Sequence, residues 1–170
     1  MTRDPYQQVL DELGVLQALA EFEPTVIGTP PLGIDVSTSD IDVACTASDL
    51  SGFKSVATAQ YGDQADFAVK ELKRFGAPSL GVTFSTADWE IELFCQQLPI
   101  SEQWGVRHFN VEQRVLLLCP ELREQVIELK QAGVKTEPAF AQLLDLQGDP
   151  YEAVLELENW SDEALVAAAG

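Results

Sequence analysis

The sequence has few basic residues, and this shortage limits the kinds of partner that the protein can bind. It contains only 10 Lys and Arg against 28 Asp and Glu, which gives a net charge of −18. A long nucleic-acid footprint needs a basic surface, so the composition argues against one. We therefore expect neutral or cationic partners. Any bound polyphosphate would need a metal ion and a local basic patch to offset the acidic surroundings.

Cysteine is also scarce, and long hydrophobic runs are absent. Cys45, Cys95 and Cys119 are widely separated and form no Cys-x-x-Cys pair, which argues against a zinc site and favours buried, reduced thiols. No segment approaches the roughly 20 apolar residues of a membrane span. The N-terminus has no apolar signal core. We expect a cytoplasmic protein that does not associate with a membrane.

The order of the apolar patterns predicts an α+β fold, with residues 1–170 forming one domain. We expect a small mixed or antiparallel sheet of about five strands in the region of about 1–98, and a helical cap over about 99–170. The expected strands are 25–27, 40–45, 66–73, 79–84 and 89–95. The expected helices are about 5–21, 49–61, 101–118, 120–133, 136–146 and 149 onward, with a short last turn from Ser161.

Three local signals set the details of this prediction. Asp4 is expected to cap a first helix that continues to about Glu21. Pro30 and Pro31 are expected to make the following loop stiff and non-helical. Ser101 is expected to cap the first helix of the C-terminal region.

Two acids occupy alternate positions at the second expected strand. Asp40 and Asp42 flank Ile41, and side chains alternate between faces along a strand, so the two carboxylates project to the same side about 7 Å apart. Such charges repel each other unless a cation lies between them, and hard divalent cations such as Mg²⁺ or Mn²⁺ prefer oxygen ligands. The pattern favours a metal site. The alternative is an exposed strand end whose acids face water.

A third acid is available from the last expected strand. Trp89, Ile91 and Leu93 face one side of this strand, whereas Glu90 and Glu92 face the other. A buried strand rarely presents two acids together, because unpaired buried charge is costly. If this strand lies beside the Asp40/Asp42 strand, Glu92 completes a cluster of three carboxylates. Glu90 takes that place if the register differs.

These residues resemble the pattern of the nucleotidyltransferase superfamily related to DNA polymerase beta. The matches are Gly28-Thr29, Asp40-Ile41-Asp42, and Glu92 within Ile91-Glu92-Leu93. The resemblance implies transfer of a nucleoside monophosphate from a nucleotide triphosphate to an acceptor hydroxyl. It implies that Asp40 and Asp42 bridge two metal ions, and that Glu92 binds the metal near the acceptor and takes its proton. Gly28 and Thr29 would contact the phosphates.

A second resemblance covers Ile27 to Tyr151. The chain is similar to an uncharacterised bacterial family, domain of unknown function 4269, which is grouped with the minimal nucleotidyltransferases. The stretches that carry this resemblance are Gly28-Thr-Pro, Ser39-Asp-Ile-Asp42, Ile91-Glu-Leu-Phe94, Arg107-His108, Lys135-Thr-Glu-Pro-Ala-Phe140 and Gly148-Asp-Pro-Tyr151. One departure concerns the superfamily's phosphate cradle: Pro30 and Pro31 lack the amide donors that a helix after the glycine would offer.

The scarce basic residues are the candidates for binding phosphate. Arg107 is a candidate partner for phosphate or for the acids, with a structural ion pair as the alternative. Lys135 precedes a helix start that would suit an anion, and a plain surface lysine is the alternative. Lys70, Lys73 and Arg74 are interpreted as solvated edge charges.

Three functional hypotheses follow from these patterns. The first is a metal-dependent nucleotidyltransferase that uses a nucleotide triphosphate and acts on a small molecule or a protein, with a cationic acceptor favoured over RNA by charge alone. The second is a non-catalytic protein with the same fold that binds a nucleotide or a partner. The third is a structural metal site only.

Overall fold

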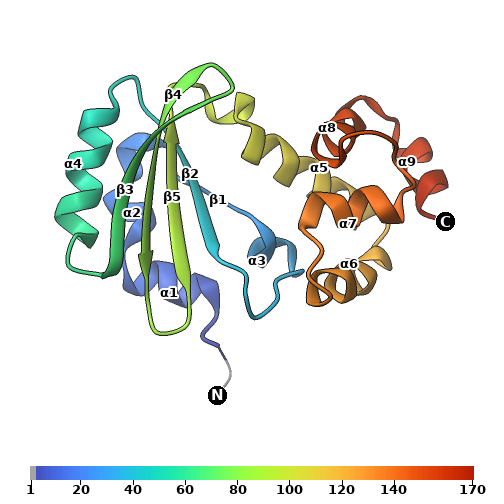
Figure 1. Cartoon of the computed structure of the whole chain (residues 1–170), viewed down its shortest axis with the longest axis horizontal. Helices are drawn as coiled ribbons and strands as arrows, with labels where there is room; N and C mark the ends of the chain where they lie inside the picture. The colour runs from blue at the N-terminus through green and yellow to red at the C-terminus, as the bar shows by residue number, and fades with distance from the viewer. Residues whose placement is uncertain (1–2) are drawn as a thin grey trace. The chain divides into compact units, whose positions relative to one another are not determined.

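The computed structural model describes residues 3–170, which form two compact units. The first unit comprises the chain up to Gly28 together with Ser39–Val106, and the second comprises Thr29–Thr38 together with Arg107–Gly170. The first contains the β-sheet and the second is helical (Figure 1). The predicted α+β class with a five-stranded mixed sheet is confirmed. The assignment of both units to one domain stays a prediction.

The sheet of the first unit has the strand order β1-β2-β5-β4-β3. β2 and β5 are parallel neighbours, whereas the pairs β1·β2, β4·β5 and β3·β4 are antiparallel. The strand bounds are Thr25–Ile27 for β1, Ile41–Thr46 for β2, Ala65–Arg74 for β3, Ala77–Ser85 for β4 and Glu90–Gln96 for β5. All five lie close to the ranges expected from the sequence. The parallel pairing places the Asp40/Asp42 region beside the Glu92 strand.

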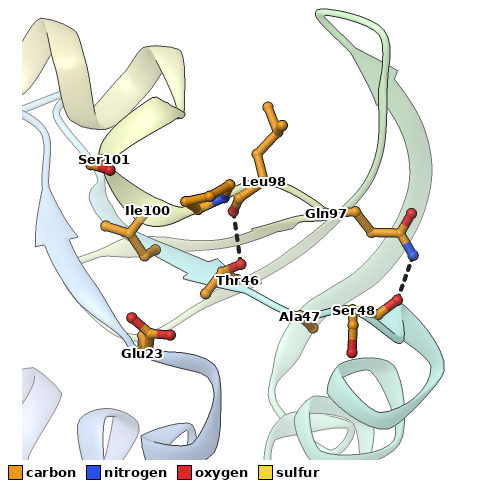
Figure 2. A pocket seen from close by; sticks show the side chains of 9 residues that line it. Glu23, Thr46, Ala47, Ser48, Gln97, Leu98, Ile100 and Ser101 are labelled. Carbon is orange, nitrogen blue, oxygen red and sulfur yellow. Dashed lines mark hydrogen bonds between the residues drawn. The ribbon is translucent and has the colours of Figure 1, made fainter.

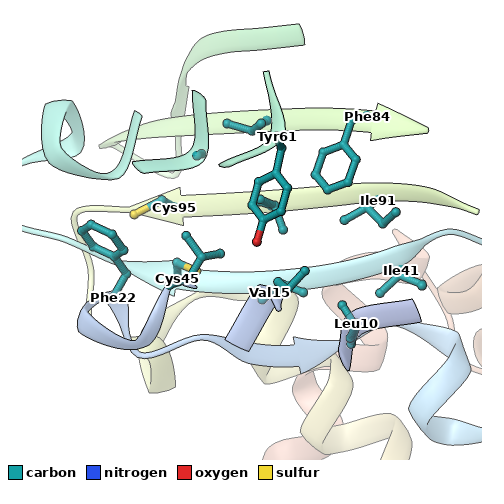
Figure 3. Packing of buried hydrophobic residues seen from close by; sticks show 14 of the residues in the cluster. Leu10, Val15, Phe22, Ile41, Cys45, Tyr61, Phe84, Ile91 and Cys95 are labelled. Carbon is teal, nitrogen blue, oxygen red and sulfur yellow. The ribbon is translucent and has the colours of Figure 1, made fainter. Parts of the chain in front are cut away.

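One face of this sheet forms the core of the first unit (Figure 3). Alternate residues of the strands point into it, and helices α1 (Tyr6–Glu12), α2 (Val15–Ala18) and α4 (Leu50–Tyr61) contribute the opposing side chains. Tyr61 stacks on Phe84 with ring centroids 4.8 Å apart. The buried strand residues of this core are Ile41, Val43, Cys45, Leu80, Val82, Phe84, Ile91, Leu93 and Cys95.

Local sequence signals explain where the helices of the first unit begin and end. The Asp49 side chain accepts a hydrogen bond from the Ser51 amide at 2.9 Å and caps α4. The single helix expected over 5–21 is wrong: Gly14 adopts a φ of 62° and separates α1 from α2, which is followed by the 3-10 turn η1 (Ala20–Phe22). Asp4 does not cap α1, because the N-cap position is Pro5, with no side-chain hydrogen bond.

The second unit is built from helices around its own apolar core. Its elements are α3 (Thr29–Leu32), α5 (Trp104–Leu118, whose first three residues belong to the first unit), α6 (Leu122–Gln131), α7 (Thr136–Leu143), α8 (Pro150–Glu156), the 3-10 turn η3 (Leu157–Asn159) and α9 (Asp162–Ala169). The core includes Ile34, Val115, Leu122, Phe140 and Leu157. Each is at most 1% exposed, so this unit has an interior of its own.

Two expectations about helix starts are corrected here. Pro30 and Pro31 lie within the short helix α3 and not in a non-helical loop, since proline is tolerated in the first turn, where an amide has no intrahelical partner. Ser101 lies inside the 3-10 turn η2 (Ile100–Glu102) and does not cap α5.

None of the helices in residues 3–170 has the length and apolar content needed to cross a bilayer.

Candidate metal centre

A row of cross-strand partners crosses the face of the sheet opposite the first unit's core. Ile27 pairs with Asp42, Asp42 with Glu92, and Glu92 with Thr83. Directly paired residues project to the same face, so Asp42 and Glu92 stand side by side there, while their neighbours Ile41, Val43 and Ile91 point into the core. We call this side, which carries Asp42, Glu92 and Thr83, the acidic face.

Three carboxylates converge on the acidic face. Asp40, Asp42 and Glu92 each place one carboxylate oxygen within 4.8 Å of the other two, and all three residues are half-buried. Glu90 is exposed and pairs with Ser85, and it is not part of this group. The register therefore places Glu92 rather than Glu90 beside Asp42. We refer to Asp40, Asp42 and Glu92 as the acidic triad.

The N-terminal segment fastens the two loops that lead into the triad. The Arg3 guanidinium donates hydrogen bonds to the carbonyls of Ser39 and Asp88. Ser39 directly precedes Asp40, and Asp88 lies two residues before the start of β5. The same guanidinium lies 3.1 Å from the ring centroid of Trp89, a cation–π contact. Trp89 in turn donates from Nε1 to the carbonyl of Asp4 at 2.9 Å. This clamp fixes the positions from which Asp40 and Glu92 project.

The backbone at Gly28 lies close to the carboxylate of Asp42. Its φ is +79°, a conformation that favours glycine, and a Cβ at this position would lie 2.4 Å from Oδ2 of Asp42. Only a residue without a side chain fits against the carboxylate as it stands. The contact of Gly28 with phosphates that the resemblance implies stays a prediction, and the close approach to Asp42 is a separate observation.

The electrostatics of the triad favour a bound cation. Burial raises the pKa of Glu92 above its ordinary value, and the negative charges of Asp40 and Glu90 raise it further, whereas Arg74 and Lys70 lower it. Two causes thus act in the same direction: the carboxylate loses water on burial, and negative neighbours repel its charge. A divalent ion would reverse this balance, and a set of carboxylate oxygens is the donor type that Mg²⁺ and Mn²⁺ prefer.

The other predicted site residues belong to the second unit. Arg107 is held by Glu158 through two hydrogen bonds of 3.0 and 2.7 Å, which matches the structural ion pair that the sequence left open. Lys135 is exposed and precedes α7, and Thr29 begins α3. Their predicted contact with phosphates stays a prediction.

Sequence reasoning overlooked a second group of side chains on the acidic face. Lys70 and Arg74 are interpreted from the sequence as solvated edge charges, and Phe75 is not among the predicted site residues. In the structure, Lys70 pairs with Gly81 on the acidic face, and Phe75 stacks on Trp104 with ring centroids 4.0 Å apart. The signal that could have revealed Phe75 is its place before a glycine in a two-residue hairpin turn, where an aromatic residue is unusual.

A pocket of about 610 Å³ opens beyond the carboxyl ends of the parallel strands β2 and β5 (Figure 2). Hydroxyl and amide groups line it, and the Thr46 hydroxyl donates to the carbonyl of Leu98 at 2.7 Å. The Glu23 carboxylate also lies at this pocket. Thr46 is four residues after Asp42 on β2, which separates the pocket from the triad by about 13 Å along the strand.

Comparison with known protein families gives one match that covers most of the chain. The family model described as Domain of unknown function (DUF4269) matches residues 8–157. No curated protein sequence matches the chain.

Solved structures share the fold at low sequence identity. A structure of Cid1 poly(U) polymerase with MgGTP bound aligns at a TM-score of 0.54 and 17% identity, over 88% of this chain and 47% of that chain. A cytoplasmic RNA terminal U-transferase aligns at 0.53 and 16% identity, over 88% and 44%. Cid1 in complex with the UTP analogue UMPNPP aligns at 0.53 and 16% identity, over 88% and 46%. The chain thus spans about half the length of these structures, and their likeness shows a nucleotidyltransferase-like fold.

Proposed function

The chain belongs to the DUF4269 family, and from this premise we propose that it is a metal-dependent nucleotidyltransferase. It would move a nucleoside monophosphate from a nucleotide triphosphate to a hydroxyl group of an acceptor. The observation that carries this proposal is the acidic triad, whose three carboxylate oxygens lie within 4.8 Å of one another on the outer face of a nucleotidyltransferase-like sheet.

Nucleotidyl transfer makes demands that this arrangement meets. Such a reaction depends mostly on positioning and on neutralising the charge of the phosphates. Two divalent ions about 3.5–4 Å apart supply that neutralisation when bound, because they hold both the attacking and the leaving oxygen. Three converging carboxylates are a suitable ligand set for such a pair, and in a chain of net charge −18 they offer no other evident benefit to folding.

Each residue of the triad has a role in this proposal. Asp40 and Asp42 hold the metal ions, and Gly28 keeps the backbone close to Asp42 without displacing its carboxylate. Glu92 binds the metal on the acceptor side and accepts the proton of the acceptor hydroxyl.

The identity of the acceptor is a proposal, because neither the structure nor the comparisons identify it. The solved neighbours are described as a poly(U) polymerase and an RNA terminal U-transferase, so the absence of a long nucleic-acid partner, expected from charge, has no support. RNA therefore stands beside a small molecule and a protein as a candidate acceptor. Use of Mg²⁺ or Mn²⁺, binding of a nucleotide triphosphate and a cytoplasmic location also stay predictions.

The proposal is tested by incubating the protein with Mn²⁺ or Mg²⁺ and nucleotides labelled at the α-phosphate, with cell extract as the source of acceptors. We expect pyrophosphate release and label transfer, and we expect Asp42→Asn to reduce both by at least about 100-fold, since it removes a direct metal ligand. Glu90→Gln is the matched control, because Glu90 is a carboxylate on the same strand as Glu92 and lies outside the triad.

Three results would contradict the proposal in different ways. Metal-dependent nucleotide binding without turnover would indicate the non-catalytic alternative, for which the missing amides of Pro30 and Pro31 provide a reason. Metal binding without nucleotide binding would indicate a structural metal. Equal losses in Asp42→Asn and Glu90→Gln would mean that net charge and not the triad supports the activity.

A further inference from the structure

Most basic side chains of residues 3–170 are engaged by other groups of the protein. The engaged residues are Arg3, Lys54, Arg107, Arg114, Arg123 and Lys130, which contact carboxylates, backbone carbonyls or a hydroxyl. Within the same range, Lys70, Lys73, Arg74 and Lys135 have neither an ion pair nor a side-chain hydrogen bond. Three of these four lie on β3, so the uncompensated positive charge of this acidic protein is concentrated on one strand.

Strand alternation divides these three cations between the two faces of the sheet. Lys70 and Arg74 lie on the acidic face, whereas Lys73 lies on the opposite side with Val69 of the core. Lys70 pairs with Gly81, at which a Cβ would lie 3.8 Å from Oε1 of Glu92.

The turn that follows Arg74 carries an aromatic ring in a costly position. Phe75 and Gly76 connect β3 to β4 with φ values of +49° and +83°. The left-handed region costs a bulky residue roughly 1 kcal/mol, and asparagine or glycine is the usual choice in such a turn. Phe75 is nevertheless 59% exposed, so core burial does not explain its presence. It stacks on Trp104 at an interplanar angle of 13°, with its ring held in place and still accessible to solvent.

The order of the strands shows on which side of the triad Lys70, Arg74 and Phe75 lie. Along the row from β1 to β3, Gly28 and Asp42 lie on one side of Glu92, and β4 and β3 lie on the other. The Phe75–Trp104 stack joins the β3–β4 turn to the start of α5, where a Cβ added at Gly105 would lie 3.2 Å from Cδ1 of Ile27. Lys70 and Arg74 therefore lie on the Glu92 side of the row, the side to which the proposed function assigns the acceptor. Their β4 partners Gly81 and Ala77 are two and six residues from Thr83, so the cations form a line that leads about 20 Å along the strands from Glu92 to the Phe75 turn.

We propose that Lys70, Arg74 and the Phe75–Trp104 stack form the acceptor subsite, and that its ligand is the end of a single-stranded nucleic acid. Its phosphates lie at the two cations, and a base stacks on the open side of the Phe75 ring. Stacking on aromatic side chains beside a basic track is how single strands are bound without sequence preference. This inference rests on the proposed function for the direction of the acceptor, but the binding itself requires no turnover.

Edge-strand protection is the alternative explanation for the cations, since lysines on an outer strand discourage pairing with another chain. That explanation applies to Lys73 as much as to Lys70, and it gives no reason for Phe75. The net charge of −18 limits the subsite to a short footprint, because phosphates beyond the two cations meet an acidic surface. We therefore expect a short strand to bind as well as a long one.

The test measures binding of a short fluorescein-labelled single-stranded oligonucleotide by fluorescence anisotropy, at low salt and without metal or nucleotide. We expect Lys70→Glu and Arg74→Glu each to weaken binding about tenfold, as the loss of a charged phosphate contact does. Lys73→Glu makes the same charge change on the opposite face, and we expect it to weaken binding less than about twofold. Phe75→Ala should weaken binding at least about fivefold, and Phe75→Tyr should restore it.

A second probe separates the phosphate contacts from the stacking contact. Inorganic polyphosphate has charge and no rings, so Lys70→Glu should weaken its binding whereas Phe75→Ala should leave it unchanged. Thermal unfolding of each variant shows whether the fold is intact, and the inference is judged on variants that keep the wild-type melting temperature.

Three outcomes would overturn the inference. Equal losses of oligonucleotide affinity in Lys70→Glu and Lys73→Glu would mean that these cations act only as edge charges. An unchanged oligonucleotide affinity in Phe75→Ala would remove the stacking contact. Binding of spermine in place of the oligonucleotide would favour the cationic acceptor that net charge suggests. A failure of the proposed function looks different, because oligonucleotide binding would then persist without any pyrophosphate release in the presence of metal and nucleotide.

Discussion

The two faces of the sheet are made from alternate residues of the same strands, and they differ in what explains them. On the core face, Ile41, Val43 and Ile91 are completely buried against helices. On the acidic face, the residues next to them in the chain are Asp40, Asp42 and Glu92, whose carboxylates crowd together. Apolar burial accounts for the first set, because it is the main favourable contribution to folding. It gives no reason for the second.

The difference teaches where to look for function in this molecule. A half-buried carboxylate beside two others raises the free energy of the folded state, and the pKa of Glu92 is raised for this reason. The left-handed backbone of Phe75 also raises the free energy of the folded state. The triad and Phe75 are thus locally unfavourable features of the first unit, as expected for a binding site that the rest of the fold has to support.

The largest effects on stability and turnover are expected from one substitution on each face of the sheet. Phe84→Ala removes a fully buried ring from the core face and should lower the free energy of unfolding by about 3–5 kcal/mol. Glu92→Gln removes a charge that burial disfavours, so it should leave the stability at neutral pH unchanged or higher. Its metal-dependent turnover should nevertheless fall at least about 100-fold. Chemical denaturation and label transfer measure the two quantities on the same preparations.

The reverse result would remove the distinction between the faces. If Glu92→Gln lowered stability as much as Phe84→Ala, the carboxylate would be a structural partner, and the acidic face would need no function to explain it. Residual turnover of Phe84→Ala has to be compared per folded molecule, because a destabilised sheet lowers activity through unfolding alone.

Two glycines of the first unit allow a finer test of the acidic face. Gly28→Ala places a Cβ against Oδ2 of Asp42 and strains a backbone with φ +79°, so the carboxylate has to move. We expect the affinity for Mn²⁺ to fall about tenfold, measured by isothermal titration calorimetry. Gly81→Ala is the control, since its Cβ would meet Leu72 and Glu92 at ordinary distances of 3.6 and 3.8 Å. An equal loss in both variants would show that the triad tolerates no added atom, whatever the position.

Much of the acidic face could be predicted from the sequence, because alternation along a strand is a local property. Asp40, Asp42 and Glu92 could be grouped once the two strands were assumed to be neighbours, and the parallel register Asp42–Glu92 confirms that assumption. The choice between Glu90 and Glu92 could not be made, since it depends on a pairing between segments about fifty residues apart.

The features that were missed depend on backbone conformation and on contacts distant in sequence. Gly14 interrupts the first helix by adopting φ 62°, although the apolar spacing continues across it. Pro30 and Pro31 start a helix although proline usually marks a break, because the first turn needs no amide donors. Phe75 meets Trp104 only after the β3–β4 hairpin forms, and no pattern within either segment announces that contact.

A carboxylate in the second unit provides a comparison with the triad. Glu112 is 5% exposed within the helical unit, and burial raises its pKa well above the ordinary value, with a further contribution from Glu137 and an opposing one from Lys130. A folded-state pKa above the unfolded one gives stability that is complete at low pH and is lost as the pH rises through the raised pKa. Glu112→Gln should remove this loss and stabilise the protein at neutral pH by about 1 kcal/mol.

Chemical denaturation of the wild type and of Glu112→Gln across a pH series measures how Glu112 affects the free energy of unfolding. Glu128→Gln is the control, because Glu128 is exposed. We expect the Glu112→Gln stability to depend less steeply on pH, and the control to follow the wild type. A loss of stability in Glu112→Gln at every pH would mean that the folded protein uses the carboxylate as a hydrogen-bond acceptor. Metal affinity should not change in Glu112→Gln, which distinguishes this acid from the triad.

The smallest effect concerns Glu90, the acid that lies on the acidic face and outside the triad. Its charge is one of the causes of the raised pKa of Glu92, so Glu90→Gln should lower that pKa. Metal binding requires the deprotonated carboxylate, and affinity for Mn²⁺ therefore falls as the pH decreases through the pKa of Glu92. In Glu90→Gln this fall should begin at a lower pH, with an affinity about two- to fivefold above the wild type in the acidic range and close to it at high pH. Lys70→Gln should move the fall in the opposite direction, because Lys70 lowers the same pKa. Shifts of equal sign in the two variants would mean that neither charge acts through Glu92, and the acidic face would then lose the electrostatic link between β3 and the triad.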